Sequence, residues 1–160
     1  MATHSDFNIA KRTGDIALLK LTESAKFTKY VQPACLYAKD DVPVSMVSTG
    51  WAVLDSNDSS VNDLLRKSSV IHVDQENCKQ TYRGIARGIE VVQDSNFCGF
   101  TDTSICYQLS GSPAFIPNLE DSRVMVVGFA SHGAGCGHRK PNVYIKISSY
   151  LDWIESVVWP

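Results

Sequence analysis

The segment CYQLSGSPA, which runs from Cys106 to Ala114, carries the most informative pattern in this sequence. A Ser-Gly pair follows a cysteine there, in a tight turn that leads into an apolar strand. Further upstream, GDIALLKL runs from Gly14 to Leu21 and places an acid at the start of a strand of alternating apolar character. These two segments stand out as the stretches that bear on the chemistry of the chain.

Composition limits the class of protein. The chain has 160 residues, which suits one globular domain or a piece of a larger protein. Apolar residues make up 44% and charged residues 20%, so the chain can bury a core. The net charge of -2 argues against a nucleic-acid binder. The longest strongly apolar run, Val124 to Ala130, is too short to cross a membrane, and the first residues show no signal peptide.

Short apolar runs separated by turn residues predict an all-β barrel or sandwich. The expected strands are Ile16–Leu21, Val44–Trp51, Lys67–Val73, Asn96–Phe100, Ser112–Pro117, Val124–Ala130 and Val143–Ile147. A short helix is expected from Gln75 to Tyr82, with Asp74 as its N-cap. A second, amphipathic helix is expected over Ser148–Val158, with Ser148 as its cap. Its apolar face would consist of Leu151, Ile154 and Val158.

The five cysteines indicate a disulfide framework, and hence an oxidising compartment. No pair has C-x-x-C spacing and no Cys/His cluster has zinc-ligand spacing, so we expect neither a metal nor a cofactor. The odd count leaves one cysteine without a partner. The alternative for each cysteine is a small buried apolar residue.

In order and separation, several motifs resemble the trypsin/chymotrypsin-like serine proteases. They are DIALLKL (15–21), QPACL (32–36), GWA (50–52), CYQLSGSP (106–113), GCG (135–137), PNVY (141–144) and YLDWI (150–154). QPACL with its lone cysteine is similar to the arthropod clip-domain subgroup. The resemblance implies a truncated chymotrypsin-like double β-barrel with a C-terminal helix. Residues 1–32 would be a remnant of the N-terminal barrel, and residues 33–160 the nearly complete C-terminal barrel and helix.

The resemblance also implies roles for individual residues. Asp15 corresponds to the aspartate that orients the catalytic histidine, and Ser110 to the nucleophile. Ser131 corresponds to the serine that supports the aspartate and lines the substrate cleft. Ser104 and Gly133 correspond to further substrate-binding positions, with Ser104 on the floor of the specificity pocket.

The same resemblance implies a pairing of the cysteines. Cys78 would bond to Cys98, and Cys106 to Cys136. Cys35 corresponds to a cysteine that bonds to a segment upstream of the protease domain, so we expect its partner outside this chain. We therefore expect the natural protein to begin before Met1 and to be extracellular.

No histidine takes the catalytic position. His4 lies too close to Asp15 in the chain, and the other three histidines lie where the family has no catalytic histidine. These three are His72, His132 and His138. Each of these three is therefore expected to be a surface or packing residue.

The nucleophile loop and the specificity pocket depart from the family as well. Gln108 and Leu109 replace Gly-Asp before the serine, and Leu109 cannot pair with a buried N-terminal ammonium. Loss of one oxyanion donor costs about a hundred- to a thousandfold in rate. At the pocket, Asn142 replaces a glycine of the wall and His132 replaces an aromatic residue of the cleft.

These departures lead us to expect a non-catalytic serine protease homologue, a binding or regulatory module of extracellular proteolysis whose partner is a protein or peptide. The alternative is an active serine endopeptidase whose upstream half, with the histidine, is missing from this chain. A third possibility is a small secreted ligand-binding β protein unrelated to proteolysis, which would not explain the ordered motifs. We expect neither a nucleic-acid nor a membrane partner.

Overall fold

The structure is a computed structural model, and it describes residues 1–51, 65–83, 92–101, 110–118, 123–133 and 140–160. The strands are β1 (Ala2–Thr3), β2 (Ala17–Leu18), β3 (Cys35–Leu36), β4 (Ser45–Gly50), β5 (Arg66–Val73), β6 (Asn96–Thr101), β7 (Pro113–Pro117), β8 (Val124–His132) and β9 (Asn142–Lys146). The helices are α1 (Gln75–Arg83), the 3₁₀ turn η1 (Ile147–Tyr150) and α2 (Leu151–Val158).

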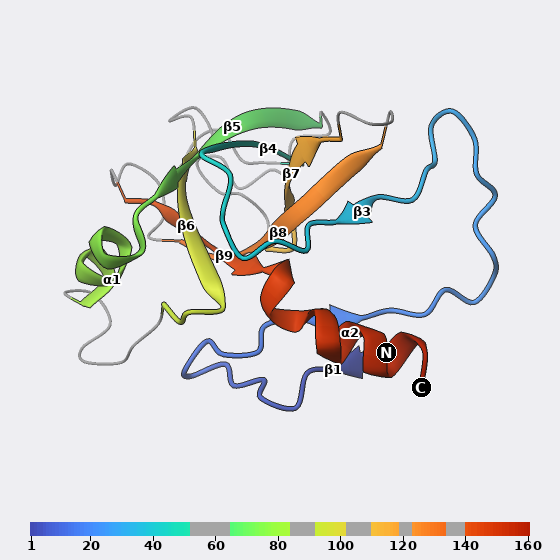
Figure 1. The fold of residues 1–160 in the computed structure, drawn as a ribbon, viewed down its shortest axis with the longest axis horizontal. Helices are drawn as coiled ribbons and strands as arrows, with labels where there is room; N and C mark the ends of the chain where they lie inside the picture. The colour runs from blue at the N-terminus through green and yellow to red at the C-terminus, as the bar shows by residue number, and fades with distance from the viewer. Residues whose placement is uncertain (52–64, 84–91, 102–109, 119–122, 134–139) are drawn as a thin grey trace.

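Six antiparallel strands close into a barrel. Their order is β4-β5-β6-β9-β8-β7, and the pairing of β7 with β4 completes the ring. β3 adds to the outside of the ring by parallel pairing with β8, with Cys35 opposite Met125. Helix α2 lies beside the barrel, and the two chain termini lie close together below it (Figure 1). This architecture confirms the partial chymotrypsin-like fold with a C-terminal helix.

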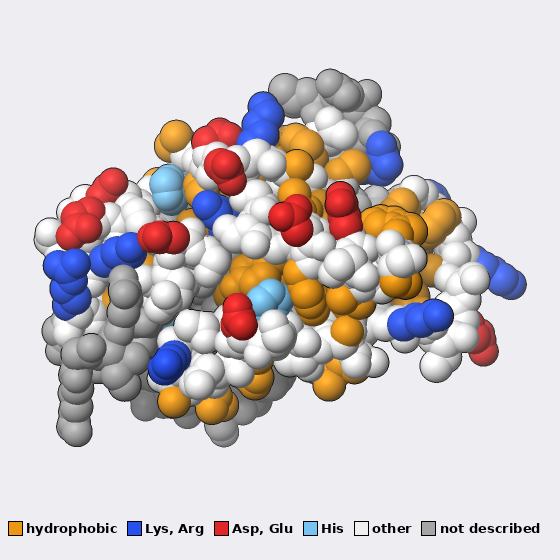
Figure 2. Space-filling model, turned by 60° about the horizontal axis from the view of Figure 1, so that its bottom comes forward, with side chains coloured by type: hydrophobic (Ala, Val, Ile, Leu, Met, Phe, Trp, Pro, Cys, Tyr) orange, Lys and Arg blue, Asp and Glu red, His pale blue; other side chains and the backbone are white. Residues whose placement is uncertain are grey.

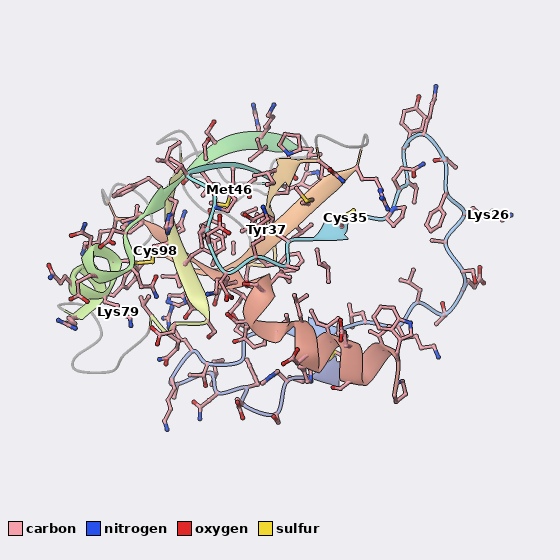
Figure 3. All side chains as sticks on the ribbon, viewed as in Figure 1. Lys26, Cys35, Tyr37, Met46, Lys79 and Cys98 are labelled. Carbon is pink, nitrogen blue, oxygen red and sulfur yellow. A yellow bond between two sulfur atoms is a disulfide. The ribbon has the colours of Figure 1, made fainter. Side chains whose placement is uncertain are left out.

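The barrel interior explains why these segments form strands. On β5, Ser68 and Val70 are buried while Lys67, Ser69 and Ile71 are exposed, so the side chains alternate with the pleat. Inside the barrel, the rings of Phe97 and Tyr144 stack with centroids 5.0 Å apart. Figure 3 shows Met46 and Tyr37 pointing into the same region.

Gly128 on β8 allows β9 to approach closely. A Cβ at this position would collide with the carbonyl oxygen of Ile145 and with the ring of Phe97. Only glycine therefore fits between β9 and the ring.

Of the two predicted helix caps, the structure contains one and lacks the other. Asp74 caps α1 as expected, because its Oδ1 accepts the backbone N–H groups of Glu76 and Asn77, both at 3.1 Å. The prediction that Ser148 caps the C-terminal helix is wrong. Ser148 lies inside the 3₁₀ turn that precedes α2, and α2 begins after Tyr150 with no side-chain cap.

The apolar face of α2 is shorter than predicted. Ile154 is buried in a hydrophobic cluster, called the α2 cluster below, whose other members are Val126, Ile145, Ile147 and Tyr150. Leu151 packs against this cluster, but Val158 is 46% exposed at the end of the helix. Val158 lies in the last turn of α2 and is not among the residues that pack against this cluster.

The strand expected over Ile16–Leu21 is also shorter than predicted. Only Ala17 and Leu18 pair, with the two residues of β1, because β1 is the only partner strand for this segment within the described residues. Ile16 and Leu18 pack against the α2 cluster, while Leu19 is 73% exposed.

Residues 19–34 run away from the barrel before the chain returns at β3 (Figure 1). Figure 3 shows Lys26 at the outermost part of this excursion. Several large apolar side chains are exposed along it, namely Leu19, Leu21, Phe27, Tyr30 and Val31. The buried hydrophobic residues of the described part of the chain form three clusters, and no side chain from residues 19–34 belongs to any of them.

The Cys78–Cys98 disulfide joins α1 to β6, as predicted, with a Cα–Cα separation of 6.2 Å. Both cysteines are fully buried, and Figure 3 shows Cys98 beside α1. Cys35 is a free, partly buried thiol. The expected Cys106–Cys136 pair lies outside the described residues.

Candidate functional site

Asp15 reaches the barrel through a folded N-terminal loop. Gly14 precedes it with φ of 58°, and a Cβ there would lie 2.7 Å from backbone atoms of Asp6 and Phe7. Glycine is therefore required both for the backbone angle and for the close approach. Thr13 Oγ1 donates to the Asp6 carbonyl at 2.8 Å and holds the two sides of the loop together.

Asp15 is hydrogen-bonded to Ser131, which is 116 residues further along the chain. The hydroxyl of Ser131 donates to Asp15 Oδ2 at 2.6 Å. A hydroxyl bound to a carboxylate at this distance forms a strong, charge-assisted hydrogen bond. Two of the residues that the family resemblance singled out are thus in direct contact.

His132 extends this interaction. Its Nδ1 lies 3.1 Å from the same Ser131 oxygen. Ser131 has one proton and gives it to Asp15, so its oxygen can only accept from the imidazole, which assigns a proton to Nδ1. The order of donation is therefore from His132 to Ser131 to Asp15.

Tyr82 of α1 supports the imidazole from the other side. Its ring meets His132 edge-on, with centroids 5.9 Å apart, and its hydroxyl donates to the Pro141 carbonyl at 2.7 Å. Burial raises the pKa of Tyr82 to about 12, and the nearby charge of Arg12 acts in the opposite direction. Tyr82 is thus neutral at physiological pH, and its ring packs against the imidazole of His132.

A pocket of about 240 Å³ opens over this group. It is lined by Phe7, Ile9, Arg12, Asp15, Ser131 and His132. The N-terminal loop thus forms one wall and the end of β8 the other. On the face shown in Figure 2, acidic and basic side chains are interspersed and apolar side chains show between them. The pocket can accommodate a side chain that is partly apolar and partly charged.

Ser110 lies on an exposed turn next to the start of β7. Gly111 follows with φ of 87°, and a Cβ there would meet nothing within 4 Å, so the backbone angle alone demands glycine. Its N–H donates to the Ala130 carbonyl at 2.7 Å, which ties the turn to β8 just before Ser131. Within the described ranges, no hydrogen bond joins the Ser110 hydroxyl to a histidine ring. Gln108 and Leu109 lie outside those ranges.

Asn142 occupies space beside Gly133. Its Nδ2 donates to Thr101 Oγ1 at 3.3 Å, and a Cβ built on Gly133 would collide with its Oδ1. The amide therefore lies directly against the Gly133 backbone. Ser104, the expected floor of the pocket, falls outside the described part of the chain.

His4 and His72 have packing environments. The His4 ring lies edge-on to Tyr150 and Trp153, with centroid distances of 5.1 and 5.0 Å, and its Nδ1 accepts the Asp6 N–H at 3.2 Å. Burial lowers the pKa of His72, and the Asp74 carboxylate partly offsets the effect.

Sequence reasoning placed His132 in the cleft but gave it no chemical role, because its bond to Ser131 depends on how β8 presents two successive side chains.

Two absences apply to the described residues only. No three His, Cys, Asp or Glu side chains gather there as metal ligands would. None of the helices in these ranges is long and apolar enough to cross a membrane.

A closed antiparallel barrel that joins an aspartate to a β8 serine, beside an exposed Ser-Gly turn, defines a serine-protease-like domain. The model of the trypsin family matches residues 1–154, and the chain belongs to that family.

Relatives of this chain occur in insects and in humans. It is 30% identical over 168 residues to Serine protease Hayan of Drosophila melanogaster, covering 98% of this chain and 26% of that protein. It is 34% identical over 165 residues to Serine protease snk of the same species, covering 98% and 37%. Transmembrane protease serine 11B of Homo sapiens is 32% identical over 165 residues, covering 96% and 37%. The chain thus spans about a quarter to a little over a third of the length of these relatives. The Drosophila relatives agree with the arthropod subgroup that the resemblance indicated.

Proposed function

We propose that this chain is part of a non-catalytic serine protease homologue that binds a protein or peptide in extracellular proteolysis. The observation that carries the proposal is the position of Asn142. Its amide lies against Gly133. By the family resemblance, Asn142 stands at the wall of the specificity pocket and Gly133 at a substrate-binding position. A side chain at that wall reduces the room for a substrate side chain, whereas the cleft near Asp15 stays open.

The nucleophile loop supports the same conclusion. Gln108 and Leu109 stand where the family has Gly-Asp. Leu109 has no group that can pair with an ammonium, and Gln108 lacks the backbone freedom of glycine at an oxyanion donor. The extracellular location is supported by the Cys78–Cys98 disulfide, since such bonds persist in oxidising compartments.

A second candidate, an active serine endopeptidase, is favoured by one observation. Ser131 donates to Asp15 at 2.6 Å, so the support of the expected triad aspartate is retained. In that case a histidine from sequence upstream of this chain would complete the site.

Labelling with a fluorophosphonate distinguishes the two candidates. We expect no labelling of Ser110 and no hydrolysis of a peptide substrate pool by the natural full-length protein. The substitutions Gln108→Gly, Leu109→Asp and Asn142→Gly, combined in that protein, test which departures matter, with Ser110→Ala as the control. Stoichiometric labelling of the unaltered protein at Ser110 would establish the enzyme and overturn the non-catalytic proposal.

The binding part of the proposal has its own test. Selection of a displayed random heptapeptide library on the immobilised chain should enrich specific peptides. The variant Ser110→Ala should enrich the same peptides, because Ser110 does not line the pocket. If no peptide is enriched, the proposed binding function fails.

A further inference from the structure

An apolar patch lies on the outer face of the barrel, where β4, β5 and β6 run side by side (Figure 1). Ile71 on β5 is paired with Phe100 on β6, and the two side chains are 47% and 42% exposed. Val44, just before β4, is 76% exposed, and its carbonyl accepts the His72 N–H at 2.9 Å. Because Val70 is buried in the barrel core, pleat alternation directs Ile71 away from the barrel. Three large apolar side chains are thus exposed on neighbouring strands.

Helix α1 follows β5 directly and lies on the same outer face. Val73 is paired with Cys98, and both lie one pleat repeat away from Ile71 and its partner, so they face the same side of the sheet. The Cys78–Cys98 disulfide holds α1 against this part of β6. The first turn of α1 therefore bounds the patch at one end.

Charges of opposite sign lie at the two ends of the patch. Lys67 is exposed four residues before Ile71 on the same face, and no ion pair among the described residues involves it. Asp74 and Glu76 follow Ile71 by three and five residues, at the start of α1, and both are exposed. The Glu76 side chain keeps 59% of its surface exposed although Arg83 lies 3.7 Å away. One end of the patch is thus basic and the other acidic.

This distribution of charge is complementary to itself. A two-fold axis through Ile71 places each residue of β5 opposite one that lies equally far from Ile71 in a second copy. Lys67 then falls between Asp74 and Glu76 of the second copy, with Ile71 and Phe100 in the middle. Sheets pack face to face about 10 Å apart, which is about the diameter of a helix. Helix α1 of each copy therefore fits beside the end of the other sheet.

We propose that this face binds a second copy of the chain and forms a two-fold symmetric dimer. Ile71 and Phe100 are buried at its centre, and Lys67 pairs with the acidic first turn of α1 in the other copy. None of these residues lines the pocket over Asp15, so the dimer is independent of the proposed peptide binding.

Analytical ultracentrifugation of the chain over a wide range of concentration measures the dissociation constant of the dimer. Ile71→Asp should raise this constant by about a hundredfold or more, because a residue at the centre of a symmetric interface is lost twice. Phe100→Ser should raise it without adding a charge. Phe27→Asp is the matched control, since Phe27 is an apolar residue that is 65% exposed outside the patch, and it should leave the constant unchanged. Thermal melting verifies that each variant is folded.

An exchange of charges tests the two-fold arrangement. Lys67→Glu and Glu76→Lys should each weaken self-association by about tenfold, as expected for exposed ion pairs that occur twice in the dimer. A mixture of the two variants should regain most of the affinity, because both contacts then join opposite charges.

A chain that stays monomeric at every concentration, or a dimer that Ile71→Asp leaves intact, would show that the inference is wrong. An equal effect of Phe27→Asp would mean that the chain associates through exposed apolar surface in general, which would also overturn it. If the mixed charge variants associate no better than either variant alone, the two-fold arrangement is wrong. The peptide selection described above tests the proposed function separately, so the two can fail independently.

Discussion

Ser131 on β8 donates a hydrogen bond of 2.6 Å to Asp15 in the N-terminal segment, across 116 residues of chain. The bond links the loop that contains Arg12 to the strand that contains His132. Because the Ser131 oxygen also accepts from His132, removal of one hydroxyl disturbs two contacts at once. The stability of the pocket therefore depends on this pair.

Ser131→Ala is expected to lower the free energy of unfolding by about 1–2 kcal/mol, since it removes a hydrogen bond to a charged group at a half-buried site. Asp15→Asn should cost a similar amount, and the double variant should cost less than the sum of the two. Urea denaturation measures all three. The control Ser149→Ala changes an exposed serine and should stay within about 0.5 kcal/mol. Strict additivity would show that the two side chains are not coupled.

Replacement of Cys78 and Cys98 together by alanine should lower the free energy of unfolding by about 3 kcal/mol. The crosslink spans 20 residues, and the chain-entropy relation gives this magnitude for a loop of that length. Denaturant unfolding of protein made in an oxidising host provides the measurement. Cys35→Ser is the control, because Cys35 is a free thiol. An unchanged midpoint in the double variant would mean that the disulfide contributes nothing.

Tyr82 should make stability depend on alkaline pH. Burial raises its pKa to about 12, above the usual value of 10.0, so the folded state retains a proton that the unfolded state loses. The contribution is complete below pH 10.0 and is lost as the pH rises toward 12. Tyr82→Phe should remove this dependence and cost about 1 kcal/mol at neutral pH, because the Pro141 carbonyl loses its donor.

The difference in phenolate absorbance between the unaltered protein and Tyr82→Phe, taken after a rapid pH jump, measures the ionisation of Tyr82. Burial also raises the pKa of Tyr144, so part of the alkaline dependence should remain in Tyr82→Phe. Arg12→Gln should raise the pKa of Tyr82 further, because the Arg12 charge lowers it. Ionisation of Tyr82 itself near pH 10 in the folded protein would contradict the burial seen at that residue.

Asp74→Ala should lower the free energy of unfolding by about 1 kcal/mol, as is typical for the loss of an N-cap. Asp74→Ser keeps an oxygen for the N–H groups of Glu76 and Asn77 and should recover most of the loss. Urea denaturation compares the variants. The pKa of His72 offers a second measurement by NMR titration. Asp74 raises this pKa, so both variants should lower it.

Much of the barrel could be predicted because its signals are local. Alternating apolar residues identified the strands from Ser45 to Lys146 with small errors at their ends. Asp74 was found as a cap because an N-cap acts on residues only two and three positions ahead. The Cys78–Cys98 bond followed from the order of the family's motifs rather than from a local pattern.

The errors occurred where a neighbour distant in sequence decides the outcome. Ser148 has the composition of a cap, but β9 continues directly into a 3₁₀ turn and places it before the helix. Residues 19–21 have strand-like alternation, yet a strand requires hydrogen bonds to a partner, and β1 offers only two residues. Val158 has the spacing of a packed residue but does not pack against the α2 cluster.

The sequence by itself determined the family, the strands of the barrel and the identity of the residues at the expected catalytic positions. Only the tertiary structure decided how these residues meet: that Ser131 gives its single proton to Asp15 and accepts from His132, that Asn142 lies against Gly133, and that Arg12 reaches the same pocket. The physical reason is range. Pleat alternation and capping act over a few residues along the chain, whereas hydrogen bonds and excluded volume act over a few ångströms in space, and the closed barrel brings distant residues within that distance.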